Sequence, residues 1–170
     1  DAVSFNATIS ACEKGSQWRC ALLSLGATPA ARAVPDAVSF SVAISACEKA
    51  GQWHCALMLL SIMPAAHATP DAASLNAAIS AVVLARRADN GSVPWRALAL
   101  LSAMAAARAA PDAVSFNATI SACEKGSQWR CALLLLGAMP AARAAPDAVS
   151  FSVAISACKK VPIQKHAADD

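Results

Sequence analysis

The sequence predicts a repeat array with mainly helical units rather than a single globular core. Pro-Asp pairs recur 35, 41 and 35 residues apart, at Pro35-Asp36, Pro70-Asp71, Pro111-Asp112 and Pro146-Asp147. A fixed period of this length is typical of a solenoid or a propeller, in which each unit packs mainly on its neighbours. The chain is 57% hydrophobic but only 5% aromatic, so its apolar residues are mostly Ala and Leu, a composition that favours helices over sheets.

The Pro-Asp pairs divide the array into units. We expect an array over residues 1–160, with units at 1–35, 36–70, 71–111 and 112–146, a partial unit at 147–160, and an irregular tail at 161–170. The chain begins at Asp1 within the repeat phase, which suggests a fragment of a longer array. The longest nearly apolar run, Cys131 to Ala142, is shorter than the roughly 20 residues that span a bilayer. We therefore expect no membrane partner, and the formal charge of +3 permits a polyanionic one.

The first element of each unit is ambiguous when judged by its pattern alone. In the first unit, Phe5, Ile9 and Cys12 fall at helical spacing behind Asp1, which can cap a helix N-terminus. However, apolar and polar residues also alternate over residues 3–10, which fits a strand equally well. Gly15 is expected to end this element as a left-handed C-cap, and Ser16 to cap the next element.

The second element of each unit is predicted to be a buried helix that begins at a tryptophan. Its apolar residues cover most of its circumference, as expected for a helix between two neighbours. Pro29, Pro64 and Pro140 should end or kink it. The tryptophans that begin these helices, which we interpret as packing residues rather than base-stacking platforms, are Trp18, Trp53, Trp95 and Trp129. The third unit is irregular, and a surface loop is expected around Asp89 to Pro94.

The seven cysteines follow the repeat and do not resemble a metal site. Three pairs stand eight residues apart, and the histidines occur at unrelated phases of the repeat. No CxxC or alternating Cys/His cluster is present, so we expect no metal and no cofactor. We interpret the cysteines as small packing residues between helices, in a reducing compartment.

The recurring unit resembles the pentatricopeptide repeat family over about residues 1–160. The resemblance lies in the 35-residue unit, the Pro-Asp junction, the [Phe/Leu]-[Asn/Ser]-x-x-Ile-Ser-Ala segment, the Lys-Gly or Lys-Ala turn and the Leu-rich second helix ending near Met. It implies an all-α fold, a right-handed α-solenoid of antiparallel helix pairs, which resolves the ambiguity between helix and strand. It also implies binding of single-stranded RNA, one base per unit, in a chloroplast or mitochondrion.

By this resemblance, a residue in each first helix and the Asp that closes the unit read one base together. The implied pairs are Asn6 with Asp36, Ser41 with Asp71, Asn76 with Asp112, and Asn117 with Asp147, and Ser152 is the reader of the partial unit. These pairs would read U or C, then G, then U or C twice, because an amide suits a pyrimidine edge and the shorter serine leaves room for a purine. The implied base-sandwiching residues are Val3, Val38, Val114 and Val149. The implied phosphate-contacting residues are Lys14, Lys49, Lys125 and Lys160.

Other interpretations of these residues stay open at this point. The aspartates could be helix N-caps, and the lysines could be cations that favour helix C-termini. No nucleophile, base and orienting residue or metal set occurs in the chain, so we expect no enzyme and assign no catalytic residue. Two further functional classes are a tetratricopeptide-like protein-binding scaffold, whose 34-residue unit fits less well, and a fragment that binds nothing. Protein partners are not indicated.

Overall fold

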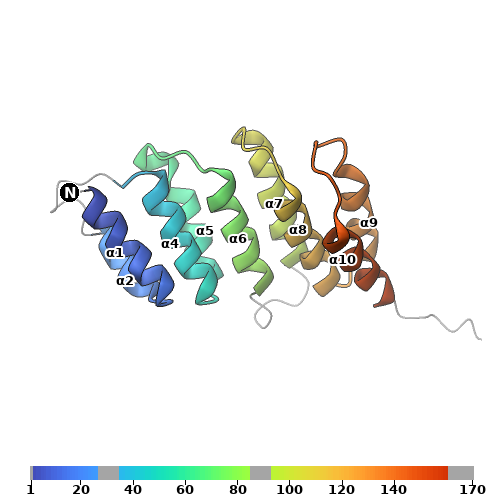
Figure 1. Cartoon of the computed structure of the whole chain (residues 1–170), viewed down its shortest axis with the longest axis horizontal. Helices are drawn as coiled ribbons and strands as arrows, with labels where there is room; N and C mark the ends of the chain where they lie inside the picture. The colour runs from blue at the N-terminus through green and yellow to red at the C-terminus, as the bar shows by residue number, and fades with distance from the viewer. Residues whose placement is uncertain (1, 27–34, 85–92, 161–170) are drawn as a thin grey trace, which may run out of the picture.

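The protein is a row of helical hairpins, as Figure 1 shows. The structure is a computed structural model that describes residues 2–26, 35–84 and 93–160, with the backbone alone for residues 2–6, 105 and 106. The first helices of the units are α1 (Ala2–Lys14), α4 (Ala37–Lys49), α6 (Ala72–Leu84), α8 (Ala113–Lys125) and α10 (Ala148–Lys159). The second helices are α2 (Trp18–Gly26), α5 (Trp53–Ile62), α7 (Val93–Ala106) and α9 (Trp129–Ala138), and a short 3-10 helix, η1 (Pro64–Ala66), follows α5.

The first helices form one continuous layer. Each packs against the next along α1, α4, α6, α8 and α10, and each second helix packs against its own first helix and the first helix of the following unit. Within the described ranges there are only helices and the turns that join them, so the all-α solenoid is confirmed and the strand alternative is wrong. None of the described helices is long and apolar enough to cross a membrane.

The core repeats with the unit. The residues that are completely buried at equivalent positions of the first helices are Ile9, Ile44, Ile79 and Ile120, and those of the second helices are Ala21, Ala56, Ala97 and Ala132. Burial of each isoleucine contributes about 1.5–3 kcal/mol. The last first helix departs from this pattern, since Phe151 is 51% exposed whereas the equivalent Phe40 is 3% exposed.

The aspartates of the Pro-Asp junctions are helix N-caps. The side chains of Asp36, Asp112 and Asp147 each accept a hydrogen bond from the backbone N–H of the serine three residues later, and the serine hydroxyl accepts one from the Asp backbone N–H in return. Asp71 makes the same pair of bonds with Ser74. These reciprocal bonds satisfy donors that the first turn of a helix leaves free, so they explain why the helices begin at the residue after each Asp.

The turns between the helices correct one prediction. The left-handed residue after α1 is Ser16, with a φ of 53°, and the equivalent residues are Gly51 (66°) and Ser127 (57°). Gly15 is therefore not the left-handed residue, and Ser16 lies within the turn rather than capping α2. The N–H of the residue after the left-handed one bonds a carbonyl five residues back, as from Gln17 to Cys12 at 2.8 Å. This bond is the signature of a Schellman motif.

Proline ends the second helices as predicted where it is described. Helix α5 ends at Ile62 before Pro64, and α9 ends at Ala138 before Pro140. Helix α7 has Ala105 at the corresponding position and is longer, with 14 residues against 10. Pro29 and the tail predicted over residues 161–170 lie outside the described residues.

The third unit departs from the predicted register. Val93 and Pro94 form the start of α7, so they do not belong to the expected loop, whose remaining residues lie outside the described ranges. The buried Ala97 lies three residues after Pro94, whereas Ala56 lies three residues after Trp53. Pro94 thus occupies the position of the tryptophans in the other units. Trp95 is 60% exposed, and the prediction that it packs between helices is wrong.

Candidate nucleic-acid interface

The predicted base-reading residues lie on the first helices, one turn after the capping aspartates. Ser41, Asn76 and Asn117 are half-buried at equivalent positions of α4, α6 and α8. Ser152 is exposed on α10. The side chains of Asn6 and Val3 lie outside the described residues. Because the first helices stand side by side, these positions form one row along the layer.

Each predicted pair with both side chains described is joined by a hydrogen bond between neighbouring units. Asn117 Nδ2 donates to Asp147 Oδ1 at 3.2 Å, and Asn76 Nδ2 donates to Asp112 Oδ1 at 3.4 Å. In the second unit the residue is a serine, which has a shorter side chain, and Ser41 Oγ lies 3.2 Å from Asp71 Oδ1 and 2.8 Å from the carbonyl oxygen of Ala37. The stacking of units therefore brings together the two residues of each pair, which are 30 to 36 positions apart in the sequence.

The two interpretations of the aspartates are compatible, because one carboxylate can do both tasks. Hydrogen bonds from the Ser150 backbone and the Asn117 amide hold the pKa of Asp147 below its ordinary value. Partial burial raises the pKa of Asp112, but the equivalent bonds from Ser115 and Asn76 outweigh that effect, so its pKa is also lowered. These carboxylates are thus charged acceptors at neutral pH. Their capping role is a finding, and their base-reading role stays a prediction.

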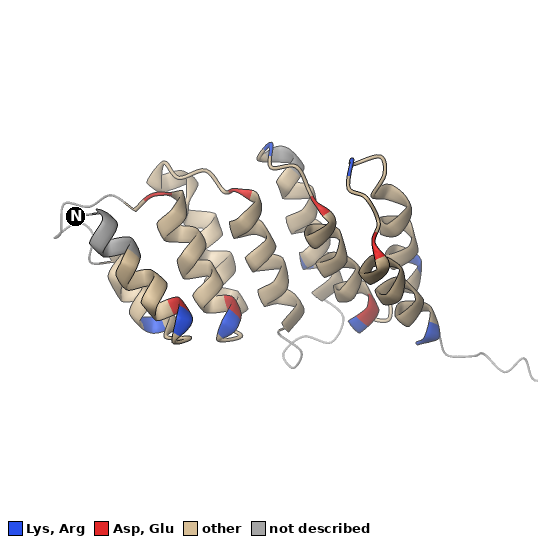
Figure 2. Cartoon of the chain, in the orientation of Figure 1, with Lys and Arg blue, Asp and Glu red and all other residues tan. Residues whose placement is uncertain are grey.

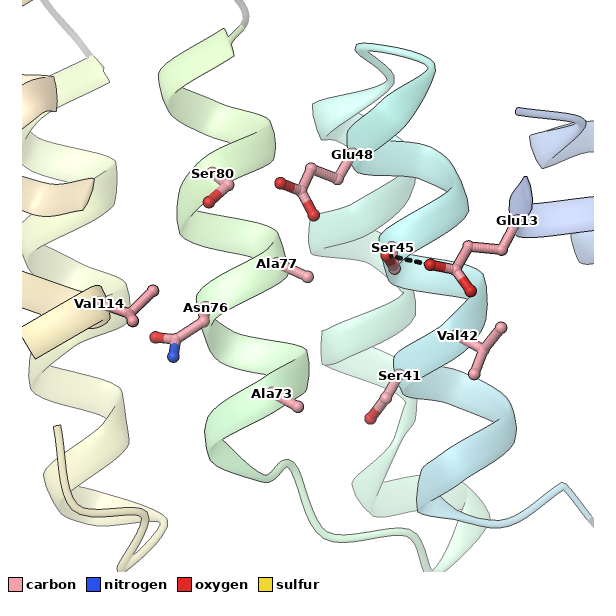
Figure 3. A pocket seen from close by; sticks show the side chains of 10 residues that line it. All are labelled: Glu13, Ser41, Val42, Ser45, Glu48, Ala73, Asn76, Ala77, Ser80 and Val114. Carbon is pink, nitrogen blue, oxygen red and sulfur yellow. Dashed lines mark hydrogen bonds between the residues drawn. The ribbon is translucent and has the colours of Figure 1, made fainter. Parts of the chain in front are cut away.

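The predicted base-sandwiching valines are exposed beside this row. Val38, Val114 and Val149 each expose more than half of their surface. An open groove of about 400 Å³ runs across α4 and α6, and its lining includes the reading residues Ser41 and Asn76 together with Val114. Figure 3 shows the side chains of Asn76 and Val114 next to each other, between α6 and α8. The third unit has the smaller Ala73 at the valine position.

The predicted phosphate-contacting lysines lie at the other end of the first helices. Figure 2 shows basic and acidic residues together at the C-terminal ends of α1 and α4, opposite the aspartates at the helix N-termini. Lys49 Nζ lies 2.9 Å from Glu13 Oε1, and Lys160 Nζ lies 3.0 Å from Glu124 Oε1. Each of these lysines is therefore paired with the glutamate of the preceding unit. A phosphate would have to compete with that carboxylate.

Lys125 and Lys14 differ from the two paired lysines. Lys125 Nζ donates to the backbone oxygen of Val83 at 3.4 Å, because the third unit has valine where the others have glutamate. Lys14 is exposed at the end of α1. Exposed ion pairs such as Lys49 with Glu13 contribute only about 0–1 kcal/mol, so an RNA phosphate could replace the carboxylate at low cost.

Glu48 lacks the lysine that pairs with its equivalents, because Leu84 stands at that position in the third unit. Burial raises the pKa of Glu48, and the hydrogen bond from Ser80 opposes that shift only in part. Glu13 shows the opposite effect, since the hydrogen bond from Lys49 lowers its pKa. Both carboxylates line the groove, with Glu48 facing Ser80 (Figure 3). The groove is thus less basic than the lysine positions alone suggested.

Two of the cysteines are buried packing residues, four are partly buried, and Cys20 is exposed. All seven are free, and Cys47 and Cys123 are completely buried. Burial, with a smaller effect of Cys55, raises the pKa of Cys47 to about 12. Among the described residues, no three His, Cys, Asp or Glu side chains gather closely enough to hold a metal ion.

Sequence reasoning missed two sets of residues at this interface. The first is the buried serines Ser115 and Ser150, whose hydroxyls contact the reading asparagines of the preceding units. The second is the glutamates Glu13 and Glu124, which pair with the lysines. A serine stands three residues after the aspartate of every Pro-Asp junction, a spacing that indicates a capping box and could have identified the serines.

The comparisons with known proteins agree with this geometry. The family model described as "PPR repeat" matches residues 38–66. The solved structure of the pentatricopeptide repeat protein PPR10 from maize superposes with a TM-score of 0.78 at 20% identity, covering 94% of this chain and 22% of that one. The PPR domain of Arabidopsis thaliana protein-only RNase P 1, solved in complex with tRNA, superposes with a TM-score of 0.74 at 12% identity, covering 89% of this chain and 77% of that one.

The chain therefore spans about a fifth of the length of the maize protein structure. No curated protein matches the sequence significantly. The family match covers a single unit, but the first twelve residues of that unit, 36–47, recur without change at 147–158, and residues 1–23 recur at 112–134. The chain therefore contains a pentatricopeptide repeat at residues 38–66, and the array as a whole has the fold of two solved pentatricopeptide repeat structures.

Proposed function

We propose that this chain binds single-stranded RNA with sequence selectivity, reading one base per unit through the paired residues of neighbouring first helices. The observation that supports this proposal best is the repeated hydrogen bond between reading residue and aspartate, from Asn117 to Asp147 and from Asn76 to Asp112. A pair held in this way offers a base a donor and acceptors in a defined arrangement. The row of such pairs is the arrangement that a stretched RNA strand would need.

The chemistry of each pair suggests which base it prefers. An asparagine amide provides one N–H donor and one acceptor oxygen next to the charged aspartate, which suits the Watson-Crick edge of U or C. Ser41 is shorter and leaves space for a purine, and its neighbour Asp71 can accept from the N–H groups of G. The described pairs would thus read G, then U or C, then U or C. With Asn6 and Asp36 added, the preferred order is U or C, then G, then U or C twice, from 5′ to 3′, and UGUU is one sequence that fits it.

The exposed valines suit the faces of the bases. Val38, Val114 and Val149 stand beside the reading row without being covered, so flat bases could insert between them. Lysines at the opposite helix ends would contact phosphates after displacing Glu13 and Glu124. The solved Arabidopsis relative was crystallised with tRNA, which supports RNA as the class of ligand. We further propose that the chain acts by occupying a transcript in an organelle, without cleaving it.

Binding of short RNA oligonucleotides tests this proposal. Fluorescence anisotropy at a fixed salt concentration would compare an RNA that contains UGUU with a scrambled RNA of the same composition. We expect tighter binding of the UGUU oligonucleotide. Equal binding of both would contradict selective recognition, and tight association with a protein but not with RNA would favour the scaffold alternative.

A further inference from the structure

Two serines make a contact that capping does not require. Ser115 and Ser150 are completely buried and occupy the third position of α8 and α10. Ser115 Oγ lies 2.6 Å from Asn76 Oδ1, and Ser150 Oγ lies 2.6 Å from Asn117 Oδ1. Each hydroxyl thus touches the reading asparagine of the preceding unit as well as the aspartate of its own.

The Ser150 hydroxyl can donate one hydrogen bond, and two acceptors compete for it. Ser150 Oγ accepts from the Asp147 backbone N–H at 3.1 Å and has one hydrogen to donate. Its two acceptors are Asn117 Oδ1 at 2.6 Å and Asp147 Oδ1 at 2.9 Å. Asp147 Oδ1 already accepts from the Ser150 backbone at 2.8 Å and from Asn117 Nδ2 at 3.2 Å. The shorter distance and the other donors to the carboxylate favour donation to the asparagine oxygen.

This donation fixes the orientation of the asparagine amide. With Oδ1 toward the serine hydroxyl and Nδ2 toward the carboxylate, both groups have complementary partners. The reversed amide would place Oδ1 against Asp147 Oδ1, two acceptors, and would lose the hydrogen bond that the Ser150 hydroxyl donates to Oδ1. One N–H of Nδ2 and one lone pair of Oδ1 then remain for a ligand, in a single order.

The second and third units provide a natural contrast. Ser74 caps α6 with the same backbone bonds to Asp71, at 2.8 and 3.0 Å. Its hydroxyl, however, donates to the main-chain oxygen of Asp71 at 2.9 Å. The reading residue before it is Ser41, whose hydroxyl contacts Ala37 and Asp71. The contact to the reading residue therefore occurs where that residue is asparagine and is replaced where it is serine.

We propose that Ser115 and Ser150 are positioning residues for base discrimination, because they orient the amides of Asn76 and Asn117 and so fix the order of donor and acceptor that a base meets. This inference rests on the proposed RNA binding. It extends the reading group of these units from two residues to three. It also predicts that a serine-reading unit does not depend on its capping serine for selectivity.

Matched substitutions test the proposal. In Ser150→Ala the aspartate cap keeps its backbone hydrogen bond, but the hydroxyl that orients Asn117 is lost. We expect the preference for U over A at the base read by Asn117 to fall about two- to tenfold, the range for one neutral hydrogen bond. Ser74→Ala removes an equivalent capping hydroxyl and should leave the preference at the Ser41 base unchanged. Ser150→Thr keeps the hydroxyl and should restore the preference. Equal losses in Ser150→Ala and Ser74→Ala would overturn the proposal.

A measurement without RNA separates this inference from the proposed function. Nuclear magnetic resonance can follow the exchange of side-chain amide protons with water. In the wild-type chain, Asn76 and Asn117 should exchange more slowly than the exposed Gln128, and Ser150→Ala should accelerate Asn117 alone. If Asn117 exchanges as fast as Gln128 in the wild-type chain, the amide is not oriented and the inference is wrong, whether or not RNA binds. If the amide is protected but the wild-type chain does not discriminate U from A, the proposed function fails and the specificity role fails with it.

Discussion

A neighbouring helix, and not a left-handed backbone, explains why glycine stands at position 126. Gly126 caps α8 with φ −87° and ψ 7°, a conformation open to any residue, and the equivalent Ala50 has φ −86° and ψ 0°. A Cβ at Gly126 would lie 2.3 Å from Cγ and 3.0 Å from Cδ of Pro94, the buried residue at the start of α7. A rigid proline ring cannot turn away, so either α7 or the end of α8 must move.

The expected cost follows from two opposing effects. Overpacking in a close-packed contact costs about 1–3 kcal/mol. Replacing glycine by alanine in a compatible conformation stabilises by about 0.4–1 kcal/mol through the unfolded chain. Gly126→Ala should therefore lower the free energy of unfolding by about 1.3 kcal/mol, within a range of about 0–2.6 kcal/mol. The matched control is Gly15→Ala, where the nearest atom to the new Cβ is Cγ of the flexible Gln17 at 3.4 Å, and which should stabilise by about 0.4–1 kcal/mol.

Urea denaturation of the two variants and the wild-type chain provides the assay. The midpoints should shift in opposite directions while the slope with denaturant stays constant. A Gly126→Ala variant as stable as Gly15→Ala would mean that Pro94 does not contact the end of α8. It would then refute the register that we assign to the third unit.

Three further outcomes are expected. Ser127→Gly should raise the free energy of unfolding, measured in urea, by about 0.5–1 kcal/mol. The left-handed φ of 57° costs a serine about 1–2 kcal/mol, and the greater freedom of glycine in the unfolded chain offsets part of the gain. An unchanged denaturation midpoint would contradict this prediction. The pKa values of Asp112 and Asp147 are lowered, so these carboxylates stabilise the fold above their ordinary pKa of about 4, and this stabilisation is lost as the pH falls through the lowered values. Changing both residues to Asn should therefore flatten the acid side of the profile of stability against pH, measured by circular dichroism. A variant profile parallel to that of the wild-type chain would contradict this. Glu13→Gln should release Lys49 and make RNA binding tighter and more dependent on salt, whereas weaker binding in anisotropy titrations would show that the ion pair helps to build the interface.

Much of the fold could be predicted because each unit carries its own local signals. The aspartates of the Pro-Asp junctions begin the first helices, and the prolines after Ile62 and Ala138 end two of the second helices. The error at Gly15 arose because the glycine was judged in one unit alone. The second unit has Lys-Ala-Gly, and its left-handed residue is Gly51, which aligns with Ser16 rather than Gly15. Aligning the turns of all units would have identified the correct position.

The third unit could not be predicted in the same way, because an insertion changes which residue faces the core. The tryptophan is the most visible residue at the start of a second helix, and it suggested that Trp95 aligns with Trp53. The alanine three residues later indicates the register instead, since it is fully buried in both units, as Ala56 and as Ala97. Only the packing shows that Pro94 takes the tryptophan position.

Contacts between neighbouring units are the part of the candidate site that the sequence of one unit does not predict. The pairing of Lys49 with Glu13 and of Ser150 with Asn117 joins residues 36 and 33 positions apart. The lysines appeared free in the sequence because their partners belong to the preceding unit. The family resemblance, by contrast, implied the pairs of Ser41, Asn76 and Asn117 with aspartates; the structure brings these pairs together, and their base-reading role stays a prediction.

Exchanging the residue at position 41 is a direct test of whether these pairs read bases. Ser41→Asn would give the second unit the same Asn-Asp pair as its neighbours, so its preferred base should change from G to U or C. Affinities of the wild-type chain and this variant would be measured for RNAs containing UGUU and UUUU at one salt concentration. We expect the wild-type chain to bind UGUU more tightly than UUUU, and the variant to bind UUUU more tightly than UGUU. The same preference in both proteins, or no preference in either, would contradict base reading by these pairs.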